Sequence, residues 1–134
     1  MKKMSRVLAA VLALVLLITG CGGRVNGVNR IIGDSELYSE TEIESAMSVV
    51  IRKFRSDFDG CTLLELSYDE EKTAKEQERH MEKGETDKVM VLSSKFYVAE
   101  GDGSLSPGTT YEGWTWELTR SGFGGWKLTN YGFA

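Results

Sequence analysis

A run of apolar residues spaced three and four positions apart leaves little choice of local structure between residues 43 and 58. Its members are Ile43, Ala46, Met47, Val50, Ile51, Phe54 and Phe58. This spacing places all of them on one face of an α-helix, and that face has to be buried. Ser39 followed three residues later by Glu42 is typical of a capping box at the start of a helix. Asp59-Gly60 is typical of the end of a helix. The sequence therefore predicts a helix over residues 40–57.

Much of the remaining chain alternates between apolar and polar residues, which is the pattern of half-buried strands. Strands are predicted over residues 61–68, 88–99, 111–120 and 126–132. In the first of these, Leu64, Leu66 and Tyr68 are expected on one face, with Leu63, Glu65 and Ser67 on the other. We therefore predict an α+β domain in which one long amphipathic helix packs on a four-stranded, or slightly larger, antiparallel sheet.

Two segments between the predicted strands have different compositions. Residues 69–84 are strongly charged, which is compatible with a short exposed helix or with an irregular excursion. Residues 100–110 are rich in turn-forming residues and are expected to form a loop. Asp102 in that loop is interpreted as a turn former.

The N-terminus has the organisation of a secretory signal peptide. Lys2, Lys3 and Arg6 precede an apolar run over residues 7–18, which is shorter than the roughly 20 residues that a membrane-spanning helix requires. Ile18-Thr19-Gly20-Cys21 closely resembles a bacterial lipobox. The resemblance implies that the Cys21 sulfur receives a diacylglycerol and that a peptidase cuts between Gly20 and Cys21. Two acyl chains would hold such a protein firmly on a membrane.

These features predict three parts of the chain. Residues 1–20 are expected to be a lipoprotein signal peptide, residues 21–34 a lipidated cysteine followed by a flexible tether rich in Gly and Asn, and residues 35–134 the α+β domain. The protein is therefore expected on the extracytoplasmic face of the cell membrane. Cys61 is expected to be buried as a small apolar side chain.

Charge limits the partners of this domain. Without Lys2, Lys3 and Arg6, 13 of the 16 basic residues remain against 20 acidic ones, a formal net charge of −7. An acidic surface disfavours nucleic acid and electrostatic adhesion to anionic lipid headgroups. The expected membrane contact is the lipid on Cys21, and the sequence names no protein or small-molecule partner.

Two resemblances extend over the mature chain. The last hairpin, Trp114-x-Trp116-x-Leu118-x-Arg120 followed by Gly124-Gly125-Trp126-Lys127-Leu128, resembles that of many cystatin-like and NTF2-like domains. A longer series resembles the domain-of-unknown-function 4829 family of small clostridia-type lipoproteins. It consists of Tyr38-Ser39-Glu40, Glu42-Ile43, Ala46-Met47, Gly60-Cys61-Thr62-Leu63, Tyr68-Asp69-Glu70-Glu71, Gly101-Asp102-Gly103-Ser104-Leu105, Trp114-x-Trp116 and Gly125-Trp126-Lys127-Leu128. This likeness covers residues 30–133 and implies a Gram-positive-type surface location, but no activity and no site residues.

The polar residues form no catalytic, cofactor or metal motif in the sequence. His80, the only histidine, lies among charged residues and is interpreted as a solvated surface side chain. Asp69-Glu70-Glu71 lacks the alternating ligands and turn glycine of a calcium loop, so a solvated acidic turn is favoured.

An aromatic set offers the only candidate pocket, and its members are Tyr68, Phe96, Trp114, Trp116 and Trp126. Packing under the helix is favoured, while an open apolar ligand site is the alternative. Three functions follow as hypotheses. The favoured one is a membrane-anchored binding or interaction module. The alternatives are a small hydrolase- or isomerase-like enzyme that uses a sheet–helix pocket, and a structural envelope-assembly protein that uses an exposed strand edge.

Overall fold

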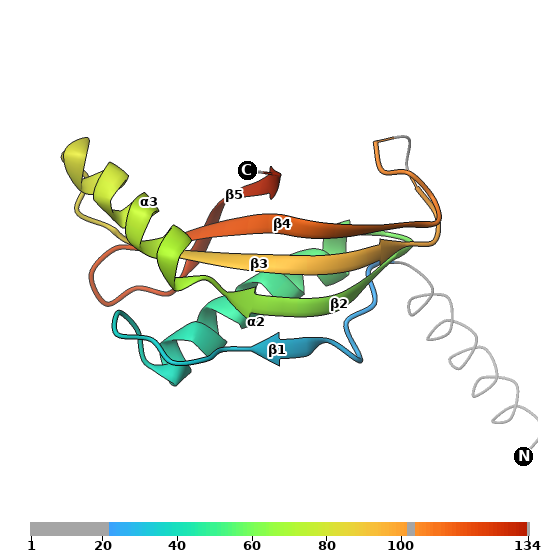
Figure 1. Cartoon of the computed structure of the whole chain (residues 1–134), viewed down its shortest axis with the longest axis horizontal. Helices are drawn as coiled ribbons and strands as arrows, with labels where there is room; N and C mark the ends of the chain where they lie inside the picture. Colours follow the sequence, from blue (N-terminus) through green and yellow to red (C-terminus); the bar gives the residue numbers. More distant parts are fainter. Residues whose placement is uncertain (1–21, 102–103, 134) are drawn as a thin grey trace, which may run out of the picture.

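The computed structural model describes residues 22–101 and 104–133. Its elements in chain order are β1 (Asn29–Ile31), α2 (Glu40–Asp57), β2 (Cys61–Tyr68), α3 (Glu70–Glu82), β3 (Lys88–Val98), β4 (Thr109–Arg120) and β5 (Lys127–Phe133). The strands form one sheet in the order β1-β2-β3-β4-β5, with β1 parallel to β2 and the other neighbours antiparallel. The predicted α+β class is confirmed, with a fifth strand added by β1. Helix α2 crosses one face of the sheet, as Figure 1 shows.

Helix α2 has the bounds and the cap that the sequence predicts. The Ser39 side chain accepts a hydrogen bond from the Glu42 backbone, and the Glu42 carboxylate accepts one from the Ser39 backbone, each at 3.2 Å. This reciprocal capping box satisfies two N–H groups that the helix itself leaves without partners. The apolar stripe of the helix is buried against the sheet and forms the core with the inward residues of the strands.

Three bulges change which strand residues reach that core. The pairing of β2 with β3 shifts between Leu63 and Glu65, so the predicted alternation is wrong there. Leu63 is buried and Leu64 is exposed, the reverse of the expectation. Similar shifts occur where Gly113 interrupts β4 and where Thr129 interrupts β5. An extra residue in one strand reverses the faces of the residues beyond it.

The segment before α2 differs from the flexible tether expected over residues 21–34. The Gly23 N–H donates to the Arg55 carbonyl at 3.0 Å, Arg24 forms a parallel bridge with Thr62, and residues 29–31 pair with β2. A Cβ at Gly22 would clash with the Arg55 carbonyl oxygen. The glycines that suggested flexibility therefore permit close approach of two backbones. The predicted signal peptide and Cys21 lie outside the described residues.

Helix α3 resolves the charged segment as a helix. Asp69 caps it by accepting from the Lys72 N–H at 2.9 Å. The helix packs on the start of β3, where Val89 and Val91 are buried but lie outside the core beneath α2. Alternate residues of a strand point to opposite faces, so α3 covers the face that α2 leaves open. Figure 1 shows the two helices on either side of the sheet.

Candidate functional site

The predicted aromatic pocket is part of the core. Phe96 and Trp116 are fully buried under α2, and Trp114 lies against Phe96 with ring centroids 5.4 Å apart. The Trp116 indole N–H donates to the Ser94 hydroxyl at 2.8 Å, so this buried polar atom has its partner. Trp114 also borders a small hollow of about 250 Å³ near the end of α2. The packing interpretation therefore accounts for these three aromatic residues.

The other two aromatic candidates lie in a separate group. Trp126 packs edge-on against Tyr38 with centroids 5.4 Å apart, and the Arg120 guanidinium stands 4.8 Å from its ring. Tyr68 also packs edge-on against Tyr38, with ring centroids 6.5 Å apart. The ring contacts thus divide the five predicted residues into two groups within the same core.

A groove lies between α3 and the face of the sheet opposite α2. Its volume is about 890 Å³. Helix α3 supplies Lys72, Lys75, Glu76, Arg79, His80 and Lys83, the following turn supplies Glu85 and Asp87, and the sheet supplies Val91, Thr115, Glu117, Thr119, Thr129, Asn130, Tyr131, Gly132 and Phe133. The groove contains many charged and hydroxyl groups, which suits a polar ligand more than an apolar one.

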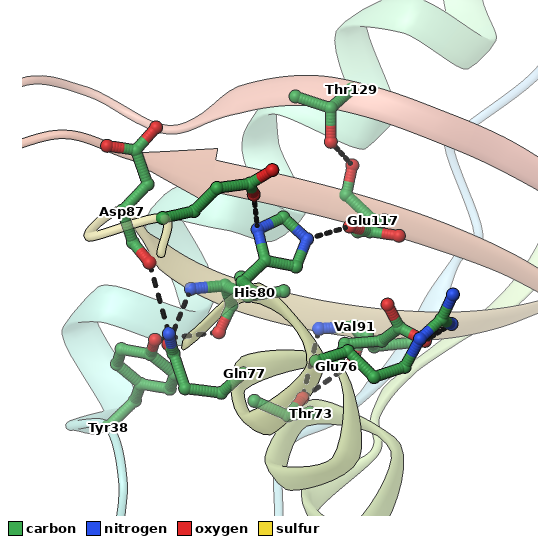
Figure 2. A network of polar contacts seen from close by, with 12 residues as sticks. Tyr38, Thr73, Glu76, Gln77, His80, Asp87, Val91, Glu117 and Thr129 are labelled. Atoms are coloured by element: carbon green, nitrogen blue, oxygen red, sulfur yellow. Dashed lines mark hydrogen bonds and ion pairs between the residues drawn. The ribbon is translucent and has the colours of Figure 1, made fainter. Parts of the chain in front are cut away.

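His80 lies at the centre of the polar contacts in this groove. Its side chain is 16 % exposed, which contradicts the expected solvated surface histidine. Nε2 lies 2.9 Å from a carboxylate oxygen of Glu117, and Nδ1 lies 2.6 Å from one of Glu85. Figure 2 shows the ring directed from α3 toward Glu117 on β4. The Nε2 contact with Glu117 is a hydrogen bond, whereas Nδ1 and the Glu85 carboxylate are in close contact without hydrogen-bond geometry.

The turn after α3 brings Glu85 to this ring. Gly84 adopts a positive φ of 80°, which glycine adopts without steric cost. The Glu85 N–H then donates to the His80 carbonyl at 2.9 Å. The chain thereby reverses beside the last turn of the helix and places the Glu85 carboxylate next to the side chain of the same histidine.

Glu76 completes the cluster from the preceding turn of α3. It lies four residues before His80, so the two side chains project from the same face of the helix. Ligand atoms of Glu76, His80 and Glu117 all lie within 4.8 Å of one another. Arg79 donates to a Glu76 carboxylate oxygen at 2.7 Å and restrains it at the rim.

This arrangement supports two kinds of chemistry. A histidine whose second nitrogen contacts a carboxylate can act as a proton donor or acceptor toward a molecule in the groove. Alternatively, one imidazole nitrogen and two carboxylates offer the donor types that bind divalent metal ions. The sequence contained one usable signal, the spacing of Glu76 and His80. It could not show that Glu117, on the outward face of β4, lies opposite them.

The acidic turn next to α3 has a structural role. Glu70 accepts hydrogen bonds at 2.9 Å from both the Ser35 and the Tyr68 hydroxyls. Loss of hydration acts to raise the pKa of the Glu70 carboxyl, but these bonds and those from the backbone of residues 36 and 37 outweigh it and lower the pKa. Glu70 therefore connects the segment before α2 to the start of α3, while Asp69 serves as the helix cap.

Cys61 is 2 % exposed, as expected, and its thiol lies 3.7 Å from the Asp59 carbonyl oxygen. Asp102 lies outside the described residues. Within residues 22–101 and 104–133, no helix has the length and apolar composition needed to cross a membrane.

Comparison of the chain with protein-family models, with curated proteins and with solved structures finds no match.

Proposed function

We propose that this chain is a lipid-anchored extracytoplasmic binding module whose ligand site is the groove between α3 and the sheet. The single observation that favours the groove is the largely buried His80 held between Glu85 and Glu117. A partly buried imidazole with two carboxylates beside it, in a groove of about 890 Å³, favours a role in binding. The membrane location rests on the lipobox-like sequence that ends at Cys21.

The path of the chain supports combining these two features in one protein. Gly23 contacts the end of α2, and Arg24 bridges to Thr62 at the start of β2. The groove lies beside α3, which follows the other end of β2. An eight-residue strand spans about 23 Å. Figure 1 shows α3 at the opposite end of the sheet from the start of β2. A lipid on Cys21 would therefore leave the groove beside α3 clear of the membrane surface.

The anchor is tested with Cys21→Ser in the full chain. We expect wild-type protein to stay with the membrane fraction and to carry a diacylglyceryl mass on the cleaved N-terminus. The variant should be unprocessed or released, because it lacks the thiol that takes the lipid. Cys61→Ser, which leaves the lipobox intact, is the matched control. Normal processing and membrane retention of Cys21→Ser would refute the anchor.

The groove is tested by filling it. Thr129 is exposed on β5 and lines the groove, so Thr129→Trp should obstruct it. Protein extracted from membranes in mild detergent would be analysed by native mass spectrometry for small molecules that remain bound. Ser48→Trp, on the exposed side of α2, is the control. We expect bound species on the wild type and the control and their loss from Thr129→Trp; equal retention in all three proteins contradicts the proposal.

A further inference from the structure

The floor of the groove holds a set of donor atoms suited to a metal ion. We propose that His80, Glu76 and Glu117 bind one first-row divalent transition-metal ion, with Zn²⁺ as the representative. Nε2 of His80 and one carboxylate oxygen from each glutamate would be the ligands. This inference rests on the groove being the binding site and specifies part of what it binds.

The distances between the donor atoms are close to those of a metal site. In a tetrahedral zinc centre, ligand atoms about 2.0–2.2 Å from the metal lie about 3.3 Å from one another. Nε2 of His80 and the Glu117 oxygen are 2.9 Å apart, and all three ligand atoms fit within 4.8 Å. Small rotations of the two glutamate side chains, both only partly buried, would bring all three ligands to bonding distance.

Glu85 supplies the outer contact that metal-bound histidines typically have. A histidine that binds a metal through one nitrogen usually donates its other ring N–H to a carboxylate or carbonyl, which fixes the ring orientation and the tautomer. Here Glu85 lies 2.6 Å from Nδ1 and thereby leaves Nε2 to face Glu76 and Glu117. A small adjustment of the exposed Glu85 side chain would turn this close contact into the hydrogen bond of a carboxylate–histidine–metal arrangement.

The charges of the contacting groups also favour a cation. Three carboxylates, those of Glu76, Glu85 and Glu117, are in direct contact with one guanidinium, Arg79, and one imidazole. Even with a protonated imidazole this group carries an excess negative charge. A divalent ion beside a neutral imidazole would balance it.

The donor types indicate the class of metal. Imidazole nitrogen favours zinc and its first-row neighbours over Mg²⁺ and Ca²⁺, which prefer more oxygen ligands. Three protein ligands leave a coordination position for water or a ligand group, as in catalytic zinc sites. That position would face the open groove, where a bound molecule could reach the ion.

The experiment uses the full chain, purified in detergent without a histidine tag and stripped with a chelator. Calorimetric titration with ZnCl₂ should show one ion per chain, and excess Mg²⁺ should not displace it. In ¹⁵N NMR, the signal of the only histidine should move at Nε2. Co²⁺ should give a visible spectrum typical of nitrogen and oxygen ligands. A thiolate charge-transfer band would mean that a cysteine binds the metal, and would overturn the proposal.

Variants separate the ligands from their surroundings. Glu117→Gln keeps the size of the side chain and removes the negative charge of a proposed ligand. Glu85→Gln removes only the negative charge of the outer contact. We expect Glu85→Gln to weaken Zn²⁺ binding about 10–100-fold, and Glu117→Gln to weaken it by more. The matched control is Glu71→Gln, an exposed acid on the same helix that does not line the groove. Thermal melts of the metal-free proteins verify that each variant folds.

The outcomes distinguish this inference from the proposed function. Unchanged affinity in Glu117→Gln, or absence of Zn²⁺ binding by the wild type, overturns the metal site. If native mass spectrometry still finds small molecules that Thr129→Trp excludes, the groove remains the binding site without a metal. Binding of Zn²⁺ with an unmoved His80 signal also overturns the inference, because the ion would then lie elsewhere.

Discussion

Hydrogen bonds from single polar side chains fix the positions of buried rings and strands in this domain. Ser94 accepts from the Trp116 indole and donates to the Trp114 carbonyl, so one hydroxyl satisfies a buried ring and fixes its strand. The Tyr38 hydroxyl donates to the Val89 carbonyl at 2.7 Å. Removing one partner of such a pair leaves a buried polar atom without its hydrogen bond, which costs more than the net value of the bond.

Tyr38 gives the domain a specific response to alkaline conditions. Burial, followed by the influence of Tyr68, raises the pKa of Tyr38 to about 12. The Tyr38 hydroxyl has a pKa of 10.0 in the unfolded chain and a higher one in the folded domain. Its contribution to the free energy of unfolding is therefore complete below pH 10 and is lost as the pH rises toward 12. Between pH 9 and pH 11, the wild type should lose about 1 kcal/mol more of its unfolding free energy than Tyr38→Phe. Urea denaturation at both pH values measures this, and equal losses would show that Tyr38 is not responsible.

Helix α3 illustrates how an element can complete a sheet with side chains. Strand β3 extends beyond the end of β2, so the N–H groups of Val89 and Val91 have no strand partner on that side. Thr73 accepts from the Val91 N–H and Gln77 from the Val89 N–H, each at 2.9 Å. The helix therefore takes the place of the missing strand and protects an edge that would otherwise be open to pairing with another chain.

Thr73→Val tests whether side chains of α3 replace the missing strand beside β3. The new side chain has nearly the same shape but cannot accept from the Val91 N–H, and the site is fully buried. We expect the unfolding free energy to fall by about 1–3 kcal/mol, as measured by urea denaturation. Thr110→Val, at an exposed position of β4, should change it by less than about 0.5 kcal/mol. Comparable effects at both positions would mean that the hydroxyl contributes little.

These elements differ in how far the sequence alone predicts them. Helix α2 was predictable because its cap and its apolar stripe are local patterns that agree with each other. Which residues of β2 face the core was not predictable, because the bulge after Leu63 depends on pairing with a strand some 30 residues away. The helical state of residues 70–82 depends on the contact with β3, since this segment has few apolar residues of its own.

At the scale of the whole molecule, the two faces of the sheet have different roles, and each is covered by a different helix. The face under α2 is filled with apolar and aromatic side chains and supplies the core. The other face, partly covered by α3, presents the groove. Glu76 and His80 are separated from Glu117 by more than 35 residues, so only the antiparallel sheet brings them together. The sequence reveals these residues but not their proximity, which is why His80 was expected in solvent.

The close packing of Gly22 and Gly23 against the end of α2 has a consequence for movement. A domain on a long linker samples many heights and tilts above a membrane. If Cys21 carries the proposed lipid, the attachment point is one residue from Gly22, which limits the height of the domain above the membrane to a narrow range. The opening beside His80 would then travel at a constant level as the protein diffuses laterally. Its encounters would be two-dimensional, with molecules that pass or are displayed at that same level of the cell envelope.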